Sequence, residues 1–75
     1  MIRTHKAQKK RYRFEINHGV CKLQKEYFED WGDSRATNRW EYRLHKLVPG
    51  STIILSCWDR RIREWVILCR GGKES

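Results

Sequence analysis

The sequence predicts an α+β fold in which a small antiparallel sheet carries two short helices on one face. Three observations favour this class: strict alternation of apolar and polar residues over 11–17, helical spacing of apolar residues over 20–47, and two β-branched, aromatic runs near the C-terminus. With 75 residues, of which 39% are hydrophobic, the chain has material for one core only. The alternative is an all-β small barrel of five strands.

The first strand is expected over residues 11–17. Tyr12, Phe14 and Ile16 alternate with polar residues, which is the period of a strand with one covered face. Gly19 follows at a position suited to a turn, because glycine tolerates positive φ. Residues 1–10 are too polar to pack, so we expect a flexible basic arm there, a single compact domain over 11–70 and a flexible tail over 71–75.

Two helices are expected in the middle of the chain. The first covers residues 20–31, where apolar residues at positions 20, 23, 27 and 31 share one helical face and Gly32 is a natural stop. The second covers residues 34–47, where apolar residues at positions 36, 40, 44 and 47 form a stripe and Pro49 lies just beyond the end.

Both middle segments also admit a strand. Residues 19–28 can pair with residues 11–17 across a turn at Gly19, and apolar and polar residues alternate over 39–45. The helical interpretation explains the caps and more of the apolar positions, although it leaves Tyr42 on the polar side. We therefore expect helices here and keep the strands as the alternative.

A β-hairpin is the clearest prediction of the C-terminal half. Residues 52–58 and 64–69 are runs of strand length, and they flank a short polar bend over 59–63. Their apolar residues are consecutive rather than alternating, which is typical of strands covered on both faces. A chain of this size covers two faces by closing a barrel or by pairing with a second protomer, so a homodimer is expected.

The distribution of charge indicates a polyanionic partner. The net charge is +8, and six of the first thirteen residues are basic while none is acidic. A field of one sign attracts polyanions, and Lys and Arg side chains that neutralise phosphates release counterions on binding. DNA or RNA is therefore the expected partner.

Three groups of residues are candidate nucleic-acid contacts. The first lies in the basic arm and the first strand, the second forms one stripe along the predicted helix 34–47, and the third surrounds the hairpin bend, where an aromatic ring beside Arg can stack a base. In that order they are Lys6, Lys9, Lys10, Arg11 and Arg13; Arg35, Arg39, Arg43 and Lys46; and Arg60, Arg61 and Arg63 with Trp58.

The leading functional hypothesis is a small, non-enzymatic nucleic-acid-binding protein. A regulator or inhibitor that binds a protein through exposed Arg and aromatic residues is the first alternative. A small basic ribonuclease is the second, but none of His5, His18 and His45 is spaced to pair with a carboxylate or a nucleophile, so no catalytic residue is predicted.

No cofactor, metal or membrane association is expected. His18 and Cys21 make the one closely spaced ligand pair, whereas structural zinc sites usually need two such pairs. Three cysteines without an export signal indicate free thiols in a reducing, cytoplasmic compartment. There is no apolar run of about 18 residues that would cross a bilayer.

Overall fold

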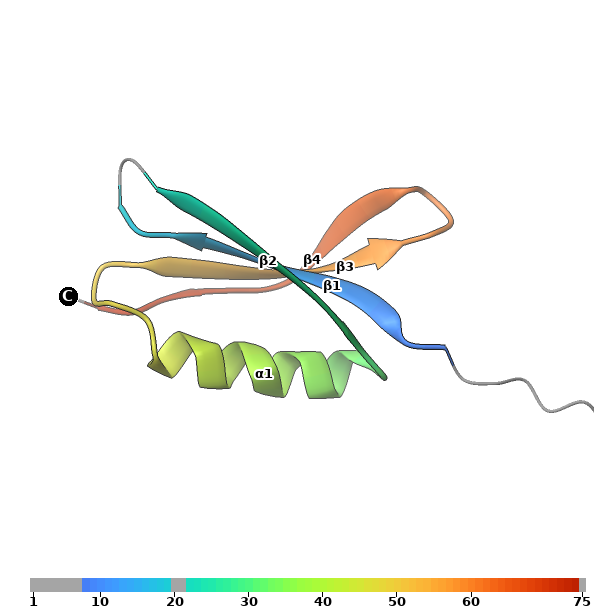
Figure 1. The fold of residues 1–75 in the computed structure, drawn as a ribbon, viewed down its shortest axis with the longest axis horizontal. Coiled ribbons are helices and arrows are strands. Elements are labelled where there is room, and N and C mark those ends of the chain that lie inside the picture. The colour runs from blue at the N-terminus through green and yellow to red at the C-terminus, as the bar shows by residue number, and fades with distance from the viewer. Residues whose placement is uncertain (1–7, 20–21, 75) are drawn as a thin grey trace, which may run out of the picture.

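The computed structural model describes residues 8–19 and 22–74 and shows a four-stranded antiparallel sheet with one helix (Figure 1). The spatial order of the strands is β2-β1-β3-β4, so the two N-terminal strands and the C-terminal hairpin meet where β1 pairs with β3. The elements are β1 (Lys10–Asn17), β2 (Leu23–Asp30), α1 (Asp33–His45), β3 (Thr52–Asp59) and β4 (Glu64–Gly72).

The core lies between α1 and one face of the sheet (Figure 1). The alternating residues of β1 and β3 supply most of it, because every second side chain of a strand points to the same face. Its buried members are Tyr12, Phe14, Ile16, Ala36, Leu47, Ile53 and Leu55, against which Phe28, Trp40, Leu44, Cys57, Leu68 and Cys69 pack. No described helix or strand packs on the other face of the sheet.

The strand 11–17, the helix 34–47 and the hairpin are confirmed, each with small shifts of its ends. The helix predicted over 20–31 is wrong: this segment contains β2, which pairs with β1 over the full length of both strands. The apolar spacing that suggested a helix marks no buried face, since Leu23, Tyr27 and Trp31 are 59%, 60% and 53% exposed. The strand alternative, with pairing across Gly19, is the correct one.

The helix prediction failed because the side chains of β2 that face α1 are mostly polar. The β2 positions opposite Phe14 and Lys10 are Glu26 and Asp30, which are polar because they bind arginines of α1. Phe28 is the one apolar side chain of β2 that packs against the core. This edge strand therefore lacks the regular alternation of apolar and polar residues that marks an amphipathic strand in a sequence.

The five-stranded barrel is also wrong, because the sheet is open and has four strands. The consecutive apolar residues of β4 have a local cause: the register with β3 shifts by one residue, from Leu55 opposite Cys69 to Ser56 opposite Ile67. This β-bulge brings the neighbours Leu68 and Cys69 to the core side together. Burial on two faces is not needed to explain the run.

The last strand runs to Gly72, so its end lies inside the segment predicted as a flexible tail. Gly71 and Gly72 pair with Ile53 and Thr52 of β3. A Cβ atom at Gly71 would lie 2.7 Å from the indole ring of Trp40, so the missing side chain lets α1 pack against the end of β4. The indole Nε1 of Trp40 donates a hydrogen bond of 3.3 Å to the carbonyl oxygen of Ile53 and fixes the ring there.

Candidate nucleic-acid interface

The sheet divides into two ribbons at the end where β1 begins. Pairing of β1 with β3 ends at Tyr12 and Cys57, whereas β1 stays paired with β2 as far as Lys10 and β3 stays paired with β4 as far as Asp59. The β1–β2 ribbon and the β3–β4 hairpin therefore separate beyond this point, as Figure 1 shows. The right-handed twist of two-stranded ribbons moves their ends apart.

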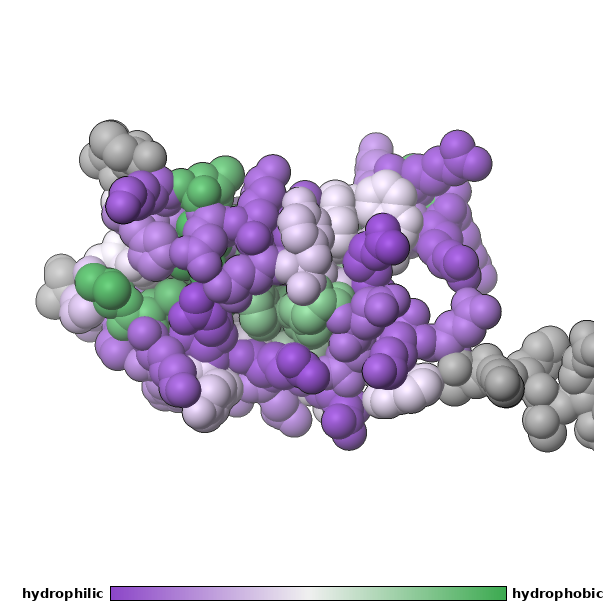
Figure 2. Space-filling view, viewed as in Figure 1, coloured by the Kyte–Doolittle hydropathy of each residue, from purple (hydrophilic) through white to green (hydrophobic). Residues whose placement is uncertain are grey.

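A groove of about 1110 Å³ lies between the two ribbons, and we call it the fork groove. Figure 2 shows the hollow beside the hairpin, bordered mostly by hydrophilic side chains. Five cationic side chains line it against three carboxylates. The lining residues are Gln8, Lys9, Lys10, Arg11, Glu29, Asp33, Cys57, Trp58, Asp59, Arg60, Arg61, Val66 and Leu68.

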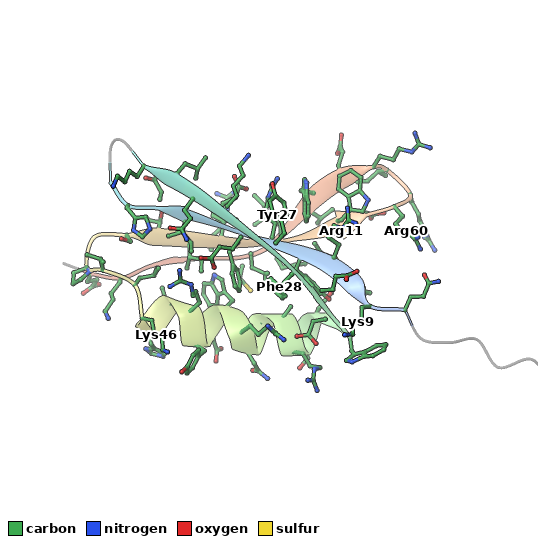
Figure 3. The ribbon with its side chains drawn as sticks, in the orientation of Figure 1. Lys9, Arg11, Tyr27, Phe28, Lys46 and Arg60 are labelled. Carbon is green, nitrogen blue, oxygen red and sulfur yellow. The ribbon has the colours of Figure 1, made fainter. Side chains whose placement is uncertain are left out.

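The fold brings together two of the three groups of candidate contacts. Lys9, Lys10 and Arg11 line the same groove as Arg60 and Arg61 of the hairpin bend, although the two segments are far apart in the chain. Figure 3 labels Lys9, Arg11 and Arg60 at this end of the sheet, and the Lys9 ammonium lies 5.2 Å from the centre of the Trp31 ring. Arg60 Nη1 donates a hydrogen bond of 3.1 Å to the side-chain oxygen of Gln8, a contact that spans the mouth of the groove.

The carboxylates of the fork groove neutralise only part of this charge. Asp33 accepts a hydrogen bond of 2.7 Å from the Tyr12 hydroxyl and lies 3.8 Å from the Lys10 ammonium. Asp59 accepts the backbone N–H of Arg61 at 2.8 Å and so shapes the bend. Among the described residues, the guanidinium groups of Arg11 and Arg61 have no carboxylate within 4.0 Å. The fork groove thus keeps an excess of positive charge.

The stripe on α1 has a different environment. Arg35 and Arg39 donate to the two oxygens of Asp30 at 2.9 and 2.6 Å, and Arg43 holds Glu26 at 2.9 Å. Asp30 is buried, with 4% of its side chain exposed. In the sequence, these acidic residues lie apart from the stripe. The pairing of β2 with β1 places them beside α1, where the arginines of the stripe bind them.

These ion pairs predict loss of stability in acid. The hydrogen bond from the backbone N–H of Trp31, helped by Arg35 and Arg39, lowers the pKa of Asp30, and the hydrogen bond from Arg43 lowers that of Glu26. The unfolded chain therefore binds more protons around the ordinary carboxyl pKa of about 4, so the free energy of unfolding falls as the pH drops through this range.

Urea denaturation of the wild-type protein and of Asp30→Asn at pH 7 and pH 3 measures this effect. We expect Asp30→Asn to be less stable than the wild type at pH 7, with a smaller loss between pH 7 and pH 3. Equal losses in the two proteins would show that Asp30 contributes nothing to the acid sensitivity.

The remaining candidate contacts are spread over the molecule. Lys46 lies at the opposite end of the sheet from the fork groove, with its ammonium 4.5 Å from the centre of the Tyr42 ring (Figure 3). Arg63 is exposed and adopts a left-handed backbone conformation with φ of 54° at the end of the hairpin bend. Lys6 lies outside the described residues, as does most of the predicted arm.

Arg13 belongs to the uncovered face of the sheet, away from α1. Its guanidinium lies 4.4 Å from the centre of the Trp65 ring and binds Glu15 at 2.8 Å. Trp65 also contacts Trp58 and Tyr27, with ring centroids 5.4 and 5.9 Å apart. We call Arg13, Tyr27, Trp58 and Trp65 the open-face cluster.

Sequence reasoning missed Tyr27 and Trp65 as site residues. Tyr27 was assigned to a helix, whereas in β2 it pairs with Arg13 and points away from α1, opposite to its neighbour Phe28 (Figure 3). The signal was present in the strand alternative for residues 19–28, because strand pairing with 11–17 brings these side chains together. Trp65 opens the second apolar run of the hairpin, beside the bend, and its sequence position alone does not show its neighbours on the sheet.

Ser56 lies beneath the open-face cluster and has no exposed surface. Its hydroxyl has no hydrogen-bond partner among the described residues. A buried hydroxyl without a partner carries a desolvation cost of about 1–3 kcal/mol, while an alanine fits the same space. We expect Ser56→Ala to raise the free energy of unfolding by about 1 kcal/mol in urea denaturation, and a loss of stability would show that the hydroxyl is satisfied.

Among residues 8–19 and 22–74 there is no group of three or more His, Cys, Asp or Glu side chains that could hold a metal ion. Cys57 and Cys69 are free thiols, and burial raises the pKa of Cys57; Cys21 lies outside the described residues. No helix in this part of the chain is long and apolar enough to cross a membrane. No protein-family model, curated protein or solved structure matches the chain.

Proposed function

We propose that the protein binds nucleic acid without catalysis and that the fork groove holds the phosphate backbone. The observation that carries this proposal is the convergence of Lys9, Lys10 and Arg11 with Arg60 and Arg61 on one groove. Such an array of Lys and Arg side chains suits a chain of phosphates, because each neutralised phosphate releases condensed counterions.

The size and lining of the groove support a polymer rather than a small molecule. Small-molecule sites are mostly apolar and enclose roughly 300–1,000 Å³. The fork groove is larger, at about 1110 Å³, and eight of its thirteen lining residues are charged. It is formed by the ends of two ribbons, so a chain can enter and leave along its length.

Salt dependence of binding tests the proposal. Fluorescence anisotropy of labelled 20-nucleotide single strands and 20-base-pair duplexes is measured at 50 and 200 mM salt. If four phosphates are neutralised, the association constant falls by about fiftyfold or more between these concentrations, because the logarithm of binding decreases by about 0.7–0.9 per contact for each decade of salt. Negligible binding of every oligonucleotide at 50 mM salt would contradict the proposal.

A further inference from the structure

The open-face cluster joins aromatic and cationic side chains from all four strands. Tyr27 comes from β2, Arg13 from β1, Trp58 from β3 and Trp65 from β4. We infer that this cluster is a platform on which unpaired bases stack, so that the protein prefers single-stranded over duplex nucleic acid. This inference rests on the proposed function of the fork groove and names the class of nucleic acid that it takes.

The contacts within the cluster fix its shape before any ligand binds. Trp65 is held by three neighbours: the Arg13 guanidinium at 4.4 Å from its ring centre, the Trp58 ring at 5.4 Å in an edge-to-face arrangement, and the Tyr27 ring at 5.9 Å. Arg13 is held in turn by Glu15 at 2.8 Å. Side chains that are already ordered lose little conformational entropy on binding, which favours affinity.

Tyr27 offers the accessible surface of the cluster. This residue is 60% exposed although it belongs to a strand, and its side chain projects from the uncovered face of the sheet (Figure 3). An exposed aromatic ring on a rigid support binds the flat face of any base, and replacing such a ring by alanine typically weakens binding markedly. Bases inside a duplex are stacked on their neighbours and cannot stack on a ring that projects from the face of a sheet.

The cluster is continuous with the fork groove through Trp58. This residue lines the groove and also contacts Trp65. A single strand whose phosphates lie among the cations of the groove can therefore turn its bases onto the adjoining sheet face. The stripe on α1, another group of candidate contacts, has Arg35, Arg39 and Arg43 bound to carboxylates.

Charge complementarity favours a polyanion over a second copy of the chain on this face. On this face Glu15 lies opposite Lys25 and Glu29 lies opposite Arg11, so the excess of positive charge comes from the exposed Arg70 on β4 and from the fork groove. A second copy that packed face to face would bring these positive groups together. A nucleic-acid strand would instead neutralise them.

The matched variants Tyr27→Ala and Tyr42→Ala test the inference. Both tyrosines are about equally exposed, at 60% and 64%, but Tyr42 lies on α1, away from the open-face cluster. We expect Tyr27→Ala to weaken binding of a 20-nucleotide single strand by about tenfold and to leave duplex binding unchanged. Tyr42→Ala should leave both unchanged, and circular dichroism establishes that both variants fold.

The outcomes separate this inference from the function on which it rests. If the wild-type protein binds duplex as well as single strand and Tyr27→Ala changes neither, the stacking platform is refuted while salt-dependent binding still supports the fork groove. If the wild-type protein binds neither, the proposed function fails. Sedimentation that shows a dimer, together with lost dimerisation in Tyr27→Ala, would assign the face to a second copy and overturn the inference.

Discussion

Replacing Arg11, Arg60 and Arg61 together by Gln is expected to weaken single-strand binding by about a hundredfold at 100 mM salt. All three side chains line the fork groove. Each phosphate contact contributes about 0.7–0.9 to the slope of log K against log salt. At 100 mM salt, one decade below 1 M, the loss of three contacts therefore lowers the association constant by roughly a hundredfold or more. The slope of binding against salt should become shallower by about two to three units, as anisotropy titrations at several salt concentrations would show.

The control variant also removes three positive charges, but at the other end of the sheet. Lys22 directly precedes β2, Lys46 follows α1 and Lys73 follows β4, and these ends of the three elements lie on the side of the molecule away from the hairpin bend (Figure 1). A variant with Gln at these positions keeps the binding of the wild-type protein to within a few fold. If both triple variants lose affinity equally, net charge rather than the groove would be responsible.

Gly71→Ala is expected to destabilise the protein by about 1–2 kcal/mol, because the added methyl group overpacks the contact with Trp40. The Cβ atom would lie 2.7 Å from a rigid indole ring that is itself hydrogen-bonded to the backbone of β3. The ring must move, and some of its contacts between α1 and the sheet are then lost. Urea denaturation of the variant measures this loss.

Two further variants establish the cause. Gly72→Ala adds the same methyl group to the same strand, but its nearest contact is 3.2 Å, so a smaller loss is expected. In a Trp40→Leu background the obstacle is smaller, and Gly71→Ala should cost less than it does in the wild-type protein. Identical costs in the two backgrounds would show that Trp40 does not determine the effect.

The elements with regular patterns could be predicted from the sequence. The alternation of Tyr12, Phe14 and Ile16 identified the central strand, and the two apolar runs identified the hairpin, because each pattern reflects burial directly. The segment 20–31 could not be assigned in this way. Its inward positions Glu26 and Asp30 bind Arg43 and Arg39 of α1, so tertiary ion pairs replace the hydrophobic signal.

The site was predictable in its charges but not in its arrangement. The basic residues at the start of β1 and at the hairpin bend are evident in the sequence, yet nothing in the sequence shows that the fork brings them to one groove. Arg35, Arg39 and Arg43 do share one face of α1, as their spacing predicts. Their carboxylate partners come from β2, a segment for which the sequence predicts a helix. Composition therefore indicated the partner class, and topology determines which cations are available to it.

The most direct test of the fork groove is a map of amide chemical-shift changes by NMR as a 20-nucleotide single strand is added at 50 mM salt. The account predicts that the largest changes lie at Lys9–Arg11 and Trp58–Arg61, with weaker changes over the open-face cluster, and that they disappear when the salt is raised. Changes centred on Arg35, Arg39 and Arg43, or none that saturate, would contradict it.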